Sequence, residues 1–190
     1  MIPHEHVPAV KLPREFYARD AASVAKDLLG KHLVRVRNGA SQIGRIVEVE
    51  AYLGPHDLAA HSARGKTART AVMFGPPGHA YIYLIYGIYH CMNVVTGREG
   101  EASAVLLRAL EPIGNIDGKT RGPGLLCRTL GIDRSMNGHD LLSDDLYIAA
   151  GPEEQFAIVE RPRIGVDYAG EWAGKPLRFY IKGNPFISRK

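Results

Sequence analysis

The sequence predicts one α+β domain with a curved, mostly antiparallel sheet, flanking helices and a protruding β-hairpin. Three observations lead to this class. A strongly alternating strand pattern covers residues 43–53, two aromatic strand patterns flank Tyr86-Gly87, and only two short helix patterns are visible. The 190 residues suffice for one well-buried core and are few for two.

The N-terminal third begins with an expected flexible arm over residues 1–15, where three prolines interrupt any apolar periodicity. Asp20 is then placed to cap a helix over residues 21–29, with Gly30 just past its end. Residues 31–36 have strand character, and Asn38-Gly39 is typical of a tight hairpin turn.

Residues 43–53 form the clearest strand pattern in the chain. Alternation puts Val47, Val49, Ala51 and Leu53 on one face, and it puts Glu48, Glu50 and Tyr52 on the other. Such a strand normally lies well inside a sheet. Two carboxylates on one of its faces therefore indicate that this face lines a cleft.

A second pair of strands is expected at residues 80–85 and 88–95, as a hairpin around Tyr86-Gly87. Tyr83 and Tyr86 lie three residues apart and cannot share a face of one strand, so Tyr86 is expected to project from the hairpin tip. Further strands are expected at residues 104–110, 156–159 and 177–181. A short helix is expected at residues 124–130, stopped by Gly131.

Composition limits the class of protein. Hydrophobic residues make up 45% of the chain and charged residues 23%, which is typical of a globular protein. No apolar run is long enough to span a bilayer, and no secretory signal is evident at the N-terminus. Cys91 and Cys127 lie outside any C-x-x-C pattern and are expected to be buried thiols. We therefore expect a cytoplasmic protein without a membrane partner.

Charge distribution is more informative than the net charge of +4. No Asp or Glu occurs between Leu58 and Arg98, while the same stretch carries basic and aromatic side chains. These are Arg64, Lys66, Arg69, Tyr81, Tyr83, Tyr86 and Tyr89. This pattern is typical of a surface for a polyanion with stackable bases, or of an aromatic sheet beside a solvated basic loop.

The residues themselves leave several roles open. Glu50 is a candidate general base, or the partner of a salt bridge to Arg45 or Arg108. His61 is a candidate for stacking or hydrogen bonding, or a structural histidine, while His56 and Asp57 are too few to indicate a metal site. Strand tyrosines such as Tyr52 and Tyr83 are commonly packing residues.

Several common motifs are missing from the chain. It has no G-x-x-x-x-G-K-[ST], G-x-G-x-x-G or G-x-S-x-G sequence, which disfavours nucleotide-driven, dinucleotide-dependent and serine-hydrolase chemistry. The Gly-Pro-Pro-Gly run at residues 75–78 is expected to be a rigid turn, because its prolines lack the N–H donors that a phosphate loop needs.

Read together, the segments resemble a known family. Residues 45–55 read RIVEVEAYLGP, residues 60–62 AHS, residues 73–87 MFGPPGHAYIYLIYG, residues 91–93 CMN, residues 105–112 VLLRALEP and residues 169–180 AGEWAGKPLRFY. In this order they closely resemble the alkyladenine, or 3-methyladenine, DNA glycosylases. The likeness runs from about Phe16 to the C-terminus, which implies a DNA glycosylase domain over residues 16–190.

The resemblance implies a role for each matching residue. Glu50 matches the carboxylate that deprotonates the attacking water, and Arg108 matches the arginine beside it. Tyr52, His61 and Tyr83 match the residues that sandwich the flipped base, and Asn93 matches the residue that rejects the guanine 2-amino group. Tyr86 matches the wedge that enters the minor groove. Arg64, Lys66 and Arg69 are expected to contact the DNA backbone.

The implied activity is base release without strand cleavage, on double-stranded DNA that contains an alkylated or deaminated purine. No cofactor and no metal are expected, and no lysine lies in the pocket motifs to form a Schiff base. Leu125 departs from the family, because relatives often carry a basic residue there. Two other classes remain open: a non-catalytic nucleic-acid-binding module on the same scaffold, and a nucleosidase that acts on free purine nucleosides.

Overall fold

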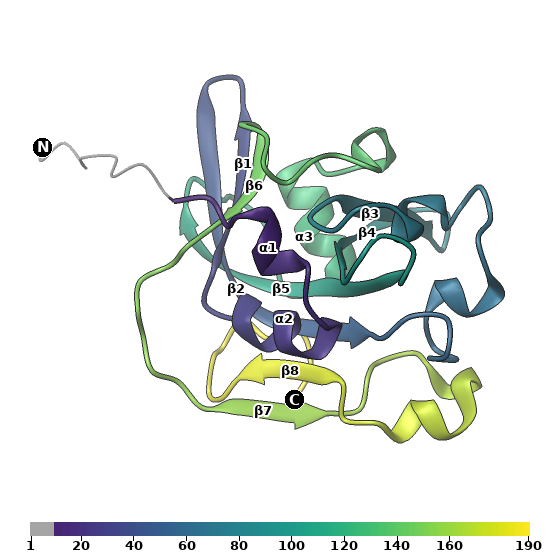
Figure 1. The fold of residues 1–190 in the computed structure, drawn as a ribbon. Helices are drawn as coiled ribbons and strands as arrows, with labels where there is room; N and C mark the ends of the chain where they lie inside the picture. The colour runs from purple at the N-terminus through teal and green to yellow at the C-terminus, as the bar shows by residue number, and fades with distance from the viewer. Residues whose placement is uncertain (1–9) are drawn as a thin grey trace, which may run out of the picture.

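A computed structural model describes residues 10–190, and eight antiparallel strands in one curved sheet form its framework (Figure 1). The strands are β1 (His32–Arg37), β2 (Ala40–Tyr52), β3 (Ala80–Ile85), β4 (Tyr89–Thr96), β5 (Ser103–Gly114), β6 (Leu146–Ala149), β7 (Ile158–Arg161) and β8 (Arg178–Ile181). Their order is β3-β4-β5-β2-β1-β6, with β8 paired to β2 and β7 paired to β8. The predicted class, a single α+β domain with a curved antiparallel sheet, is confirmed.

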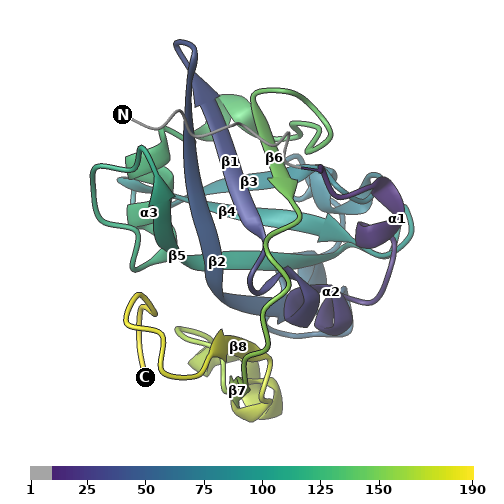
Figure 2. The ribbon, with the colours of Figure 1, turned by 90° about the vertical axis from the view of Figure 1, so that its left-hand side faces the viewer.

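Strand β2 is the longest strand and pairs with three others. It forms a hairpin with β1 through Asn38 and Gly39, whose φ angles of 50° and 75° are those of the predicted tight turn. It pairs with β5 along most of its length and with β8 at residues 48–50. Register shifts against β5 near Ile46 and Glu48 bend the strand, which lets one strand join both halves of the curved sheet (Figure 2).

Within residues 10–190, three α-helices flank the sheet: α1 (Arg14–Tyr17), α2 (Ala21–Leu28) and α3 (Pro123–Leu130). The two helices expected from sequence are confirmed, although α2 ends one residue earlier and α3 begins one residue earlier than expected. Asp20 accepts a hydrogen bond from the Ser23 N–H at 2.9 Å, and Gly131 ends α3 in the left-handed conformation. Short 3₁₀ helices cover His61–Arg64, Ala71–Phe74, Arg134–Met136 and Asp167–Gly174.

The main core lies between the concave side of the sheet and helices α2 and α3. Val47, Val49 and Ala51 on β2 are fully buried there, as the alternation predicted. Helix α2 packs on β2 and β5, and α3 packs on β4 and β5. At Gly124 a Cβ atom would lie 2.8 Å from the ring of Tyr89, so glycine is needed for the start of α3 to lie this close to β4.

The β3–β4 hairpin projects as predicted. Ile85 pairs with Tyr89, so the turn takes three residues and β4 begins one residue later than expected. Tyr86 and Gly87 have φ angles of 53° and 68°, and 85% of Tyr86 is exposed at the tip.

Other boundaries differ from the sequence predictions. The strand expected at residues 156–159 lies at residues 158–161, because its pairing with β8 ends where Ile158 meets Ile181. Strand β6 and helix α1 were not predicted. Residues 1–9 of the expected arm lie outside the described residues, while Leu12 is buried and its N–H donates to the Ile148 carbonyl, so the packed part of the chain begins before Phe16.

Candidate active site

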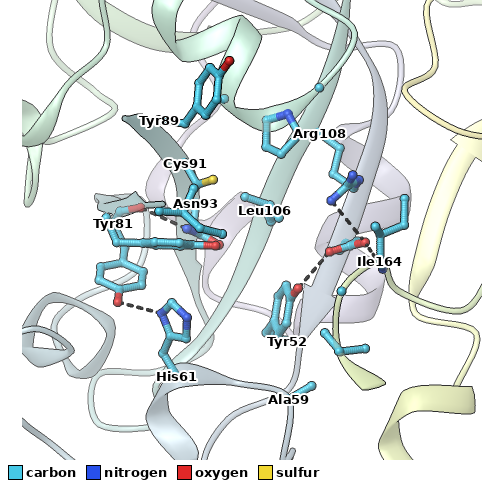
Figure 3. A pocket seen from close by; sticks show the side chains of 18 of the residues that line it. Tyr52, Ala59, His61, Tyr81, Tyr89, Cys91, Asn93, Leu106, Arg108 and Ile164 are labelled. Carbon is cyan, nitrogen blue, oxygen red and sulfur yellow. Dashed lines mark hydrogen bonds and ion pairs between the residues drawn. The ribbon is translucent and has the colours of Figure 1, made fainter. Parts of the chain in front are cut away.

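A cavity of about 520 Å³ lies where the β3–β4 hairpin, the β2–β5 pair, the start of α3 and the segment at 164–168 meet (Figure 3). Every residue assigned to the chemistry or to the base pocket from sequence lines this cavity: Glu50, Tyr52, His61, Tyr83, Asn93 and Arg108. Tyr86 and Arg69 also line it. The cavity therefore gathers residues from β2, β3, β4 and β5 that are far apart in the chain.

Glu50 is completely buried, yet it faces this cavity. One carboxylate oxygen accepts from the Ile164 N–H at 2.7 Å and lies 3.4 Å from the Arg108 guanidinium. The other oxygen accepts from the Tyr52 hydroxyl at 2.8 Å. Burial raises the pKa of Glu50 above its usual 4.5, and Arg108 and the two hydrogen bonds oppose this rise.

The salt-bridge reading of Glu50 is also realised in the structure. Arg108 supplies the partner, whereas Arg45 pairs with Glu111 and Glu154. At 3.4 Å, Arg108 favours the charged form of the carboxylate and leaves it facing the cavity. The two sequence readings, ion pair and general base, are therefore compatible.

Glu48 corrects one expectation. The alternation placed Glu48 beside Glu50 on a face that lines a cleft, but Glu48 is fully buried and does not line the cavity. Arg108, Arg178 and Ser188 surround its carboxylate. Of the two carboxylates on this face, only Glu50 reaches the cavity, because the C-terminal segment covers Glu48.

Aromatic rings form one wall of the cavity. The rings of His61 and Tyr83 lie 4.5 Å apart, and Tyr81 lies 5.6 Å from Tyr83. The Tyr81 hydroxyl is 2.9 Å from Nδ1 of His61. Burial, with Arg69 and Arg64 nearby, lowers the pKa of His61 to about 4, so the imidazole is neutral at pH 7.

Tyr81 is a site residue that the sequence analysis missed. It was noted only as part of the aromatic stretch, although strand periodicity places it on the same face as Tyr83, two residues on. Its backbone carbonyl accepts from the Asn93 side chain at 3.1 Å. Tyr81 therefore supports both the imidazole and the amide that line the cavity, as Figure 3 shows.

A second buried group missed by sequence holds the opposite wall. Asp57 and Arg163 form a completely buried pair with contacts of 2.6 and 2.9 Å. The Arg163 guanidinium also lies 4.7 Å from the centre of the Tyr52 ring. This pair fixes the segment whose Ile164 N–H reaches Glu50. No local signal marks it, because the two partners are 106 residues apart.

The pair also bears on the idea of a metal at His56 and Asp57. Both Asp57 oxygens are occupied by Arg163 and by the N–H groups of Leu53 and Ala59. Within residues 10–190, no three His, Cys, Asp or Glu side chains gather in a way that could hold a metal ion.

The basic loop lies at the mouth of the cavity. Arg69 is 5.5 Å from the Tyr83 ring and, together with Arg64, also lines an adjoining cavity of about 430 Å³. Lys66 is exposed and lines neither cavity. Of the three side chains predicted to contact a DNA backbone, Arg69 therefore lines the base pocket, Arg64 lines the adjoining cavity, and Lys66 is exposed on the same loop.

The cysteines and the length of the helices also bear on the sequence predictions. Cys91 and Cys127 are free and buried, as predicted. Over residues 10–190, no helix combines the length and the apolar character that a membrane span requires.

Comparison with known proteins identifies the class to which this fold and cavity belong. The family model described as methylpurine-DNA glycosylase matches residues 15–185. The chain belongs to the methylpurine-DNA glycosylase family. The resemblance found in the sequence is thereby confirmed, and with it a DNA glycosylase function in base excision repair.

Individual relatives match over nearly the whole chain. A protein of Legionella pneumophila (strain Lens) is 64% identical over 181 residues, which are 94% of this chain and 98% of the relative. A protein of Anaeromyxobacter dehalogenans (strain 2CP-1 / ATCC BAA-258) is 56% identical over 181 residues, with 95% and 86% covered. One of Alkaliphilus oremlandii (strain OhILAs) is 49% identical over 202 residues, with 95% and 100% covered. Each bears the name "Putative 3-methyladenine DNA glycosylase".

Proposed function

We propose that this protein is a monofunctional DNA glycosylase that flips an alkylated or deaminated purine out of duplex DNA and hydrolyses its N-glycosidic bond. One observation carries the assignment of roles. Glu50 is a fully buried carboxylate that faces an aromatic cavity large enough for a purine. Its oxygens are held by the Ile164 N–H and the Tyr52 hydroxyl, so the orientation of the Glu50 carboxylate is fixed before substrate binds.

The aromatic side chains offset the cost of flipping. Extruding a nucleotide costs a few kcal/mol, and stacking on a protein ring returns roughly 1–3 kcal/mol per base. Tyr52, His61 and Tyr83 provide such rings inside the cavity. Tyr86 is exposed at the hairpin tip beside it, where an inserted ring fills the gap left in the base stack.

Glu50 is assigned to the hydrolysis of the N-glycosidic bond. The bond between the sugar C1′ and the base nitrogen breaks, and its electrons leave with the base. A water oxygen bonds to C1′, and Glu50 takes the proton of that water. The ionised carboxylate also stabilises the positive charge that develops on the sugar. Burial raises the pKa of Glu50, and Arg108, at 3.4 Å, opposes that rise and so favours the ionised form.

No lyase step is assigned to this site. Strand cleavage by a glycosylase requires an amine that forms a Schiff base with the sugar. No lysine lines the cavity in the described part of the chain. The product is therefore an intact strand with an abasic site.

DNA is held by contacts outside the cavity. Arg64, Lys66 and Arg69 lie in the segment 58–98, which lacks acidic residues, and we assign them to phosphates. Such contacts make affinity fall as salt rises, by close to one power of the salt concentration per phosphate neutralised. We further propose that the protein acts as a monomer in the cytoplasm, on the nucleoid, which agrees with its two free buried thiols.

Two alternatives are weaker. A module that only binds nucleic acid gains nothing from an anionic carboxylate buried beside the bound polyanion, whereas Glu50 is held in that position by three partners. A nucleosidase for free purine nucleosides has no use for an exposed hairpin tip such as Tyr86.

The proposed function is tested with purified protein on duplexes that each carry one defined purine lesion. We expect release of the free base, and strand breaks only after alkali treatment. Breakage without alkali contradicts the monofunctional assignment. Release from a free nucleoside at a comparable rate favours the nucleosidase.

Tyr86→Ala is expected to weaken binding to a lesion duplex by about tenfold, because one stacked ring contributes roughly 1–3 kcal/mol. Binding to the undamaged duplex changes less, since no gap has to be filled there. Tyr86→Phe keeps the ring and is the matched control. The measurement is a pair of titrations at one salt concentration. Equal losses on both duplexes remove the wedge role.

Asn93→Ser is expected to admit bases that carry a 2-amino group. Asn93 is almost fully buried, lines the cavity and is fixed by its bond to the Tyr81 carbonyl. Guanine and hypoxanthine differ only in that amino group, so their ratio of release is an internal control. Loss of the steric barrier is expected to raise guanine release relative to hypoxanthine by about tenfold or more. An unchanged ratio contradicts the steric role of Asn93.

A further inference from the structure

A cluster of buried charged side chains lies directly behind Glu50, the proposed general base. The proposed hydrolysis does not use this cluster. Its centre is Glu48, whose side chain is completely inaccessible. Glu48 accepts hydrogen bonds from Arg108 at 3.3 Å and from Arg178 at 3.1 Å. The backbone N–H and the hydroxyl of Ser188 add contacts at 2.5 and 3.0 Å. Both oxygens of the Glu48 carboxylate are therefore occupied by donors from β5, β8 and the C-terminal segment.

Arg108 connects this cluster to the active site. Its Nε donates to Glu48 at 3.3 Å, and one of its terminal nitrogens lies 3.4 Å from Glu50. One guanidinium is thus shared almost equally between two buried carboxylates that are two residues apart on β2. Arg178 reaches Glu48 and is paired with no other carboxylate in the described residues. Two cations therefore balance two anions.

We propose that Glu48 and Arg178 are positioning residues that set how much of the Arg108 charge acts on Glu50. This inference rests on the proposed role of Glu50 as the base. When Arg178 neutralises Glu48, Arg108 is free to compensate Glu50. Without Arg178, Glu48 competes for Arg108. Without the Glu48 charge, Arg108 acts on Glu50 alone.

Other groups face Glu50 from every neighbouring element, and they are unchanged by this balance. On β2 itself Tyr52 donates to Glu50, and the segment after β7 contributes the Ile164 N–H, while Arg163 lies over the Tyr52 ring and is paired with Asp57. The hairpin contributes Tyr83 from β3 and Cys91 from β4, both of which stay neutral because burial raises their pKa values. Only Arg108 on β5 brings a charge to Glu50 that is shared with a second carboxylate.

We expect the pKa of Glu50 to shift in opposite directions when the charge of Glu48 or the charge of Arg178 is removed. Glu48→Gln removes the competing anion, which lowers the pKa of Glu50 and moves the acid limb of the rate profile to lower pH. Arg178→Gln leaves Glu48 uncompensated, which draws Arg108 away and moves the limb to higher pH. We expect each shift to be roughly half a pH unit or more, about a threefold change in rate on the limb.

The experiment measures single-turnover release of 3-methyladenine, which lacks a 2-amino group, from a methylated duplex between pH 4.5 and 8. This base is cationic and leaves without being protonated, so the acid limb reports the enzyme. Arg178→Lys keeps the positive charge and is expected to keep the acid limb of the rate profile at its wild-type pH. Arg45→Gln and Glu111→Gln remove a different ion pair between β2 and β5 and are expected to leave the limb unchanged. Ser188→Ala, which deletes one donor to Glu48, provides a milder variant if Arg178→Gln fails to fold.

A second readout separates this inference from the proposed function. The ¹³C signal of the Glu50 carboxyl, assigned by its loss in Glu50→Gln, titrates whether or not Glu50 is the base. Opposite displacements of that titration in Glu48→Gln and Arg178→Gln support the charge balance if they shrink in an Arg108→Gln background, whereas displacements that persist there are direct effects of the two charges and overturn it. Displacements of the same sign, or none, overturn it. If Glu50→Gln releases the purine at the wild-type rate, Glu50 is not the general base. The carboxyl titration still decides whether Glu48 and Arg178 control the charge that Arg108 brings to Glu50.

Discussion

Glu50→Gln is expected to lower the single-turnover rate of base release by at least about 10²–10⁴-fold, the usual contribution of a positioned general base. The amide cannot accept a proton from water and carries no charge to stabilise the developing cation on the sugar. The side chain has nearly the same volume, so the cavity keeps its shape. The rate is measured on a 3-methyladenine duplex with enzyme in excess.

The same variant is expected to keep its affinity for lesion DNA. Tyr52, His61, Tyr83 and Tyr86 are untouched, and removal of a buried anion lowers repulsion of the phosphates. Binding is measured by titration of a labelled lesion duplex, with the undamaged duplex as control. Loss of binding in parallel with loss of rate contradicts an effect on chemistry alone.

The pH dependence of stability provides an independent check on Glu50. Its pKa is raised in the folded protein, so folding favours the protonated carboxyl. The wild type therefore loses stability relative to Glu50→Gln as pH rises from about 4.5 through the folded pKa, by about 1.4 kcal/mol per unit of pKa shift. We expect Glu50→Gln to gain in relative stability between pH 5 and pH 7.5, as measured by chemical denaturation. A difference that is constant with pH contradicts a raised pKa.

Asp57→Ala is expected to be the most destabilising single substitution near the site. It leaves the Arg163 guanidinium, whose side chain is fully buried, without its anion, and breaking a buried ion pair typically costs about 3–5 kcal/mol. The segment that carries Ile164 and contacts Tyr52 loses its anchor as well, so base release falls even at temperatures where the protein is folded. The measurement is the free energy of unfolding in denaturant.

Two controls separate burial of charge from loss of a contact. Asp27 forms an exposed pair with Arg19, so Asp27→Ala is expected to cost less than about 1 kcal/mol. The double variant Asp57→Leu with Arg163→Met removes both charges and is expected to recover part of the lost stability. A cost for Asp57→Ala as small as that of the exposed pair contradicts this interpretation.

The elements that could be predicted from sequence are those with local signals. Alternation over residues 43–53 placed β2 and the opposite faces of Val49 and Glu50 correctly. The turns at Asn38-Gly39 and Tyr86-Gly87 fixed two hairpins, since their conformations depend on adjacent residues. Strand β6 is only four residues long and pairs with β1 across more than a hundred residues, so no local pattern announces it.

In the candidate site, too, some features could be predicted from sequence and others could not. The resemblance to a family assigned individual side chains such as Tyr52 and His61, and the structure places them around one cavity. The contacts that hold those side chains were not predictable. Arg163 reaches Asp57, and Ser188 reaches Glu48 across 140 residues of chain. Such long-range partners are set by the packing of the sheet and not by spacing in the sequence.

The most direct test of the central claim is a crystal structure of Glu50→Gln bound to a duplex with one hypoxanthine. We expect the hypoxanthine to lie between Tyr52 and the rings of His61 and Tyr83, with the sugar C1′ facing the substituted side chain and Tyr86 in the vacated stack. A hypoxanthine that remains stacked in the duplex, or one whose C1′ faces away from position 50, contradicts it.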